Sequence, residues 1–145
     1  MFATNTIRNT DAAAVAVRQY ENLRLRAQMG QVWAAITRRA RGLCALPDRL
    51  PSEQRYAGQK SVAIEEIRGS EGRVTDFDQE FNPLRSTTLE RWVSIFKARA
   101  QGKELPPVDL VQYGDTYYVR DGHHRISVAR ARGEAYIDAR VTLWR

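Results

Sequence analysis

Residues 117–133 read YYVRDGHHRISVARARG, and this stretch decides the fold of the chain. The apolar run Tyr117–Val119 at its start predicts a strand. The apolar spacing from Ile126 onward predicts a short helix that ends at Gly133. Asp121-Gly122 separates the two as a tight turn. A strand, a glycine turn and a helix in this order are typical of sites where a helix N-terminus meets an anion.

The five residues Asp121, Gly122, His123, His124 and Arg125, here called the box, are the candidate site. Backbone N–H groups at a helix start and the positive end of the helix dipole attract anions, and Gly122 allows a close backbone approach. Arg125 can hold a phosphate through two parallel hydrogen bonds, and both histidines can add donors. Asp121 can cap the helix, orient a histidine or help to bind a metal. Taken by itself, the stretch fits an ordinary capped turn equally well.

The flanking segments predict an α/β (α+β) domain. Apolar spacing predicts a helix from Leu89 up to Gly102, and alternation predicts strands around it. We expect strands at Val62–Ile67, Val108–Val111 and Tyr136–Leu143, a loop at residues 69–72 and a hairpin turn at Gly114-Asp115.

The first 60 residues predict one long helix or two short ones, ending before Pro47. Thr10 or Asp11 is expected to cap the first helix, and Gly30 can kink or divide it. Residues 46–60, with two prolines and a glycine, suit an irregular connection, so we divide the chain into residues 1–60 and 61–145. Trp33 is expected to be a packing anchor within a helical stripe formed by Met29, Val32, Trp33, Ile36, Ala40 and Leu43.

The basic excess of the chain lies in its N-terminal part. Residues 1–60 hold ten Lys/Arg against four Asp/Glu, whereas residues 61–145 hold thirteen of each. Such a segment is attracted to phosphate backbones through counterion release. Contact with DNA, a plain solvated face and an acidic protein partner all remain open.

The composition is that of a globular protein expected in the cytoplasm. No apolar run approaches the roughly 20 residues that span a bilayer, so no membrane partner is expected. The N-terminus lacks a signal-peptide pattern, and one cysteine, Cys44, cannot form an internal disulfide. We expect Cys44 to be a half-buried structural thiol in the apolar helix. Two adjacent histidines without a third do not favour zinc, so no protein-held metal site is predicted.

From about Val62 onward, the sequence resembles the ParB/sulfiredoxin superfamily. ParB partition proteins show the same order: an Asn-Pro…Arg element, a helix, a proline-flanked strand, a hairpin and an arginine-containing box. The matching residues are Asn82-Pro83-Leu84-Arg85, Leu89–Ala100, Gly102, Leu105-Pro106-Pro107-Val108, Tyr118-Val119, Gly122–Arg125, Ala129, Gly133 and Ala139-Arg140-Val141.

The resemblance implies a nucleotide ligand, either CTP or an ATP/ADP-like one, together with Mg²⁺. The CTP-binding members carry a glutamate and an arginine where this chain has His123 and His124, which puts CTP hydrolysis in doubt. Sulfiredoxins carry their catalytic cysteine at the position of His123, so sulfinate repair is not expected. The box is most similar to that of free-serine kinases, Asp-Gly-His-His-Arg. That similarity implies catalytic roles for Asp121, His123 and His124, with a catalytic glutamate among Glu65, Glu66 and Glu71.

The sequence therefore predicts a ParB-like module that binds a nucleotide through Gly122, His123, His124 and Arg125, in a DNA-associated or regulatory setting. A small-molecule phosphotransferase and a degenerate interaction domain are the alternatives. If the chain is an enzyme, it is a nucleotide-dependent phosphotransferase or a nucleoside triphosphatase. ParB partition proteins continue into a helix-turn-helix domain, so we expect this chain, ending at Arg145, not to act alone as a partition protein. DNA is expected to meet residues 1–60, and the oligomeric state stays open.

Overall fold

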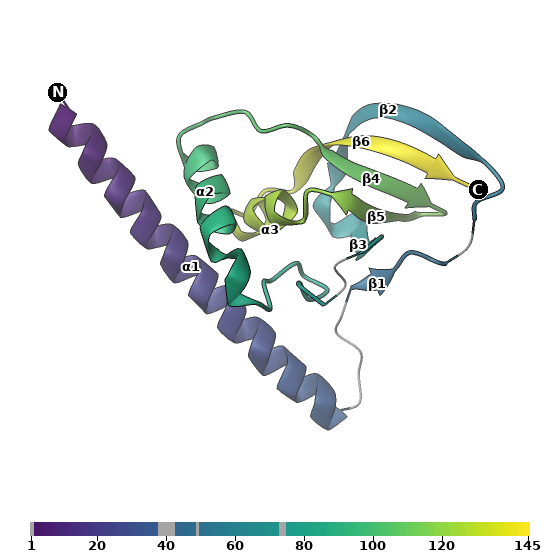
Figure 1. Cartoon of the computed structure of the whole chain (residues 1–145), viewed down its shortest axis with the longest axis horizontal. Helices are drawn as coiled ribbons and strands as arrows, with labels where there is room; N and C mark the ends of the chain where they lie inside the picture. Colours follow the sequence, from purple (N-terminus) through teal and green to yellow (C-terminus); the bar gives the residue numbers. More distant parts are fainter. Residues whose placement is uncertain (1, 38–42, 49, 73–74) are drawn as a thin grey trace.

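A mixed six-stranded sheet lies on one side of the molecule and three helices on the other (Figure 1). The computed structural model describes residues 2–37, 43–48, 50–72 and 75–145, with side chains described from residue 11 onward. In the view of Figure 1, α3 lies next to the sheet, α2 beyond it and α1 outermost. The elements follow one another as α1 (Phe2–Thr37), β1 (Cys44–Ala45), β2 (Gln54–Ala63), η1 (Ile64–Glu66), β3 (Ile67–Ser70), η2 (Ser86–Thr88), α2 (Leu89–Ala100), β4 (Val108–Tyr113), β5 (Thr116–Asp121), α3 (His123–Ala131) and β6 (Tyr136–Trp144). The predicted α/β architecture, preceded by a helix, is confirmed.

The sheet order is β1-β3-β5-β4-β6-β2. The hairpin β4–β5 is antiparallel, as is the edge pair β2–β6, and the other three pairings are parallel. In the register of the central strands, Leu110 lies opposite Val119 on one side and Val141 on the other. All three side chains are buried and belong to the main core. This arrangement places the C-terminal end of β5 next to the start of α3.

A second core joins the three helices. Ala16 and Tyr20 of α1, Trp92 and Phe96 of α2, and Val128 of α3 are all buried in this cluster. The Tyr20 and Trp92 rings meet edge to face, with centroids 5.6 Å apart, an arrangement that aromatic quadrupoles favour. The cluster fixes the middle of α1 to the body of the molecule. None of the helices in the described residues is long and apolar enough to cross a bilayer.

Tyr20 is the point at which α1 is tied to the loop before α2. Its side chain is completely buried, and its hydroxyl donates to the carbonyl of Arg85 and lies 2.8 Å from Thr88 Oγ1. Burial raises the pKa of Tyr20 above its usual value, and the hydrogen bond with Thr88 partly offsets that shift. The neutral phenol is therefore the form that the folded chain favours.

Replacing Tyr20 with phenylalanine is expected to lower the free energy of unfolding by about 1 kcal/mol, the usual net contribution of one hydrogen bond. Because the folded state holds the phenol proton more tightly, the stability from Tyr20 is present below the ordinary tyrosine pKa and lost as pH rises through the raised one. Urea unfolding at neutral and alkaline pH measures both effects. Tyr20→Phe should flatten the alkaline loss, and an unchanged alkaline slope would contradict the assignment.

The N-terminal part is one long helix that runs through Gly30 without division, which is one of the two predicted alternatives. It differs from the prediction in its start, at Phe2 rather than at Thr10 or Asp11, and in the segment that follows it. Strand β2 begins at Gln54, so part of the predicted connection 46–60 is a strand, and the boundary expected after residue 60 falls inside β2. Most β2 side chains are exposed at the sheet edge and polar, so they carry no hydrophobic alternation that would predict a strand.

The part of the predicted packing stripe that lies on α1, Met29 to Ile36, faces solvent, whereas Leu43 lies beyond the helix and is buried in the main core. Trp33 is 64% exposed, so the prediction that it is a packing anchor is wrong. Small residues, together with Tyr20, form the buried face of α1 instead: Ala16, Tyr20, Ala27, Gly30 and Ala34. Ala40 of the predicted stripe lies outside the described residues. Two apolar faces on one helix explain the error, because periodicity predicts a helix but does not choose between its faces.

Two short segments also differ. Cys44 lies in strand β1 and is exposed, so it is neither helical nor half-buried. The strand predicted at Val62–Ile67 is divided between the end of β2, the turn η1 and the start of β3. Ser70, predicted to lie in a loop, closes β3 instead. The predictions for α2, β4, β5, α3 and β6 are confirmed to within a few residues.

Candidate functional site

The box lies at the junction between β5 and α3, as the sequence predicts. β5 ends at Asp121, and Gly122 turns the chain with φ of 110° before α3 begins at His123. The first helical hydrogen bond runs from the Ile126 N–H to the Gly122 carbonyl, at 3.0 Å. A Cβ atom on Gly122 would lie 2.8 Å from the Val108 Cβ atom, closer than side chains pack. Glycine is therefore required here both by its φ and by the lack of space.

All five box residues line one pocket of about 360 Å³. The pocket is lined on its other sides by Glu71, Gly72, Arg91, Ile95 and Arg120. Residues from the loop after β3 and from α2, β5 and α3 thus converge on the N-terminus of α3, a helix of nine residues. Both histidines are largely buried, at 5% and 6% exposure, so each presents only a small part of its ring to the pocket.

Ser70 fixes the ring of His123. The Ser70 hydroxyl is fully buried, and its Oγ lies 2.6 Å from His123 Nε2. The same Oγ contacts the carbonyl of Gly72, which can only accept a hydrogen bond. The hydrogen bond between Ser70 and Nε2 fixes the orientation of the His123 ring.

Phe77 covers the histidine pair. Its ring stacks on His123, with centroids 6.0 Å apart and an interplanar angle of 16°. It meets His124 edge-on, at 5.4 Å and 86°. Phe77 is itself completely buried. Together with Ser70, it restricts the side-chain rotamers of both histidines, which is the preorganisation that binding sites require.

The Asn-Pro element of the sequence holds Phe77 in place. The buried Asp78 carboxylate accepts hydrogen bonds from the backbone N–H groups of Glu80 and Asn82, both 2.9 Å, and from the Asn82 side chain at 3.1 Å. These bonds satisfy a carboxylate that would otherwise be costly to bury. The motif that carried the resemblance therefore supports the wall of the site and does not itself line the pocket.

Arg125 is held from three sides. Its Nη1 donates to the carbonyls of Pro106 and Pro107, at 2.6 and 2.9 Å, and its Nη2 donates to Asp121 at 3.0 Å. These bonds use three of the five guanidinium donors. Arg125 thus connects the start of α3 to the segment that leads into β4, independently of any contact that it makes with a ligand.

Two further arginines border the pocket. Arg120 donates to Glu71 at 2.8 Å, so its charge is paired. Arg91, exposed on α2, makes no ion pair with any of the described residues. With Arg125 paired to Asp121, the lining carries a net positive charge that comes from Arg91. An anion entering the pocket would meet that charge together with the N-terminus of α3.

The structure brings the five predicted box residues together and adds others. Of the three candidate glutamates, Glu71 lines the pocket, whereas Glu65 and Glu66 lie elsewhere, in η1. Sequence reasoning missed Ser70, Phe77 and Arg91. No local pattern marks them, because each lies on a different element from the box and only the folded chain brings them to it.

The pocket does not fit a metal held by the protein alone. No group of three or more His, Cys, Asp or Glu side chains is placed to hold a metal ion within the part of the chain that is described. Glu71 and Asp121, the two carboxylates in the lining, do fit a Mg²⁺ ion that is held mainly by phosphate oxygens and water.

No protein-family model matches the chain, and no curated protein sequence matches it. Among solved structures, its fold is similar to that of sulfiredoxin from Arabidopsis thaliana, with a TM-score of 0.45 and 20% sequence identity. The likeness covers 57% of this chain and 82% of the sulfiredoxin chain, and at this identity it concerns the fold alone.

Proposed function

We propose that the pocket at the box binds the phosphate groups of a nucleotide, and that the chain is a nucleotide-binding regulatory module. The observation that carries the proposal is the meeting of Arg91, which has no ion-pair partner among the described residues, with the N-terminus of α3 across one pocket. Helix N-termini bind phosphate through backbone N–H groups, and a nearby guanidinium adds charge-assisted hydrogen bonds.

The charges around the pocket support an anionic ligand. Arg91 attracts the anion, and Arg120 can turn from Glu71 toward a phosphate, because this ion pair is more than one-third exposed and such pairs contribute little to stability. His123 and His124 are further candidate donors in the lining. Mg²⁺ would arrive with the nucleotide, with Glu71 and Asp121 as its candidate protein ligands.

A phosphotransferase is the second candidate, and Glu71 is the observation that favours it. A carboxylate beside bound phosphate can take the proton of an acceptor hydroxyl while the oxygen of that hydroxyl attacks phosphorus. The new oxygen–phosphorus bond forms as the bond to the leaving nucleotide breaks, which releases a nucleoside diphosphate from a triphosphate donor or a nucleoside monophosphate from ADP. Glu71 lines the pocket together with Asp121, so base and ligand would meet in one place.

The first test measures binding. Thermal shift with CTP, ATP, ADP and inorganic phosphate, each with and without Mg²⁺, identifies the ligand, because selective binding stabilises the folded state. Calorimetry on Arg91→Gln should then show about tenfold weaker binding, the scale of one charge-assisted hydrogen bond or about 1.4 kcal/mol. Lys103→Gln is the matched control, since Lys103 is exposed and lies outside the pocket lining.

The same ligands separate the two functions. Binding without turnover to a shorter nucleotide supports the regulatory module, whereas phosphoryl transfer to a small hydroxyl acceptor that is lost in Glu71→Gln supports the phosphotransferase. If no phosphate compound stabilises the chain, or if Arg91→Gln and Lys103→Gln bind equally well, the proposal is wrong.

The proposed regulatory setting includes association with DNA, which residues 1–60 would contact. Arg18 and Arg26 are exposed on α1, the element most distant from the sheet in Figure 1. DNA would therefore contact α1 and not the box, through phosphate contacts that weaken with salt.

A further inference from the structure

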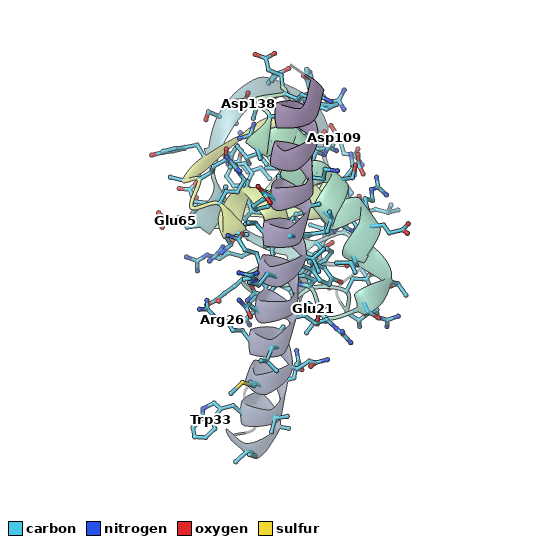
Figure 2. The ribbon with its side chains drawn as sticks, turned by 90° about the vertical axis from the view of Figure 1, so that its left-hand side faces the viewer. Glu21, Arg26, Trp33, Glu65, Asp109 and Asp138 are labelled. Atoms are coloured by element: carbon cyan, nitrogen blue, oxygen red, sulfur yellow. The ribbon has the colours of Figure 1, made fainter. Side chains whose placement is uncertain are left out.

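Helix α1 has an apolar face directed away from the rest of the chain. Figure 2 looks at this side of α1, with the body of the molecule behind it and Trp33 near the end of the helix. Five large apolar side chains on it are between 56% and 70% exposed. We call these residues the outer stripe: Leu25, Met29, Val32, Trp33 and Ile36.

The outer stripe has the spacing of a coiled-coil seam. Leu25, Met29, Val32 and Ile36 follow one another at steps of four, three and four residues, which are the d and a positions of a heptad repeat. Trp33 occupies the adjacent e position. The residues that dock α1 on its own body, Tyr20 among them, fall at positions b and f of the same repeat. The seam and the docking face are thus almost opposite each other.

The residues beside the seam carry complementary charges. Glu21 takes a g position and Arg26 the e position five residues later. In a parallel pair of helices, each g side chain meets the e side chain five positions on in its partner. Two symmetric Glu21–Arg26 pairs would form in this way. Both side chains are exposed, and within the described residues the ion-pair contact of Glu21 is the one with Arg24 of its own helix, at 3.9 Å.

We propose that α1 pairs in parallel with α1 of a second copy of this chain, through the outer stripe. Asn22 falls at the a position before Leu25, and a single polar a residue favours a parallel dimer with one register. From the exposed fractions, burying the stripe removes roughly 1,200 Å² from the two copies, the lower end of specific interfaces. The helix is already formed on its own body, so pairing does not have to meet the cost of helix nucleation.

Association is tested by sedimentation equilibrium of the full chain between about 1 and 300 µM, the range expected of a small interface. We expect a monomer–dimer equilibrium that Leu25→Asp with Val32→Asp weakens at least a hundredfold. Both residues are exposed, so circular dichroism and the melting temperature should remain unchanged at a concentration at which the parent chain is monomeric. Leu50→Asp is the matched control, because Leu50 is 97% exposed and lies beside Tyr113 and Trp144 at the ends of β4 and β6, and this variant should dimerise like the parent chain.

The parallel orientation is tested by charge exchange. Glu21→Arg and Arg26→Glu should each weaken self-association several-fold, and an equimolar mixture should recover it, since the two variants present opposite charges to each other. A chain that stays monomeric throughout this range, or a dimer that the double aspartate variant leaves intact, would overturn the proposal. A mixture no tighter than its components would overturn the parallel pairing. Monomers that instead bind anionic vesicles through the stripe would assign this face to a lipid surface.

Discussion

Replacing Gly122 with alanine is expected to destabilise the chain by about 2–5 kcal/mol, since it combines a left-handed backbone conformation with overpacking. The φ of 110° disfavours any residue with a Cβ, and that Cβ would lie 2.8 Å from Val108 Cβ in β4. The completely buried Val108 has little room to move. Relief would shift the start of α3, and the box would move with it.

Gly133, just beyond the other end of α3, provides the matched control. Its φ is 74°, but a Cβ there would meet nothing within 4 Å. Gly133→Ala should therefore lose only about 1 kcal/mol for the backbone conformation. Urea unfolding of both variants isolates the effect of the close approach. Equal losses of unfolding free energy in the two variants would mean that β4 shifts easily to make room for the added Cβ atom. Packing against Val108 would then not position the box.

The part of the fold around the box could be predicted because its signals are local. A β-prone run, a turn glycine and a helical spacing all fall within residues 117–133, and α2 has a clear apolar face. β2 could not be predicted in the same way, because its place at the sheet edge leaves Tyr56 and most of its neighbours exposed. Its pairing with β6 depends on residues some 80 positions later in the chain.

The errors in α1 and in the site have a common physical origin. Large apolar residues dominate a hydrophobic pattern, so the pattern predicts the exposed stripe around Trp33 as the packing face, while the alanines beside Tyr20 carry little signal. In the same way, the box predicted the position of the site but not its walls. Ser70, Phe77 and Arg91 are brought to His123 and the helix start by tertiary packing, which spacing along one segment does not encode.

Replacing Arg125 with alanine is expected to lower the free energy of unfolding by about 2–3 kcal/mol, because it leaves two carbonyls without their charged donor. The two carbonyls are those of Pro106 and Pro107. The ion pair with Asp121 adds little, since that carboxylate is 64% exposed. For a chain of this length, the loss corresponds to roughly 5–10 °C in melting temperature.

Two further variants identify which bonds matter. Asp121→Asn keeps the contacts of Arg125 with the two carbonyls, so it should lower the free energy of unfolding by less than about 1 kcal/mol. Arg125→Lys restores the charge but not the planar fork that reaches both carbonyls, so it should recover only part of the stability. A melting temperature of Arg125→Ala equal to that of the parent chain would show that the contacts with Pro106 and Pro107 contribute nothing.

Binding by the same variant then separates the two roles of Arg125. The sequence predicts it as the main phosphate ligand, and that remains a prediction, whereas its three hydrogen bonds give it a structural role as well. Calorimetry is done with the nucleotide that the thermal-shift test identifies, at a temperature where Arg125→Ala is fully folded. Under these conditions it measures the ligand role of Arg125 separately from the loss of stability. We expect weaker binding than in Arg91→Gln, because the start of α3 loses its link to the segment before β4 as well as a donor. Affinity equal to that of the parent chain would leave Arg125 as a purely structural residue and place the phosphate with Arg91.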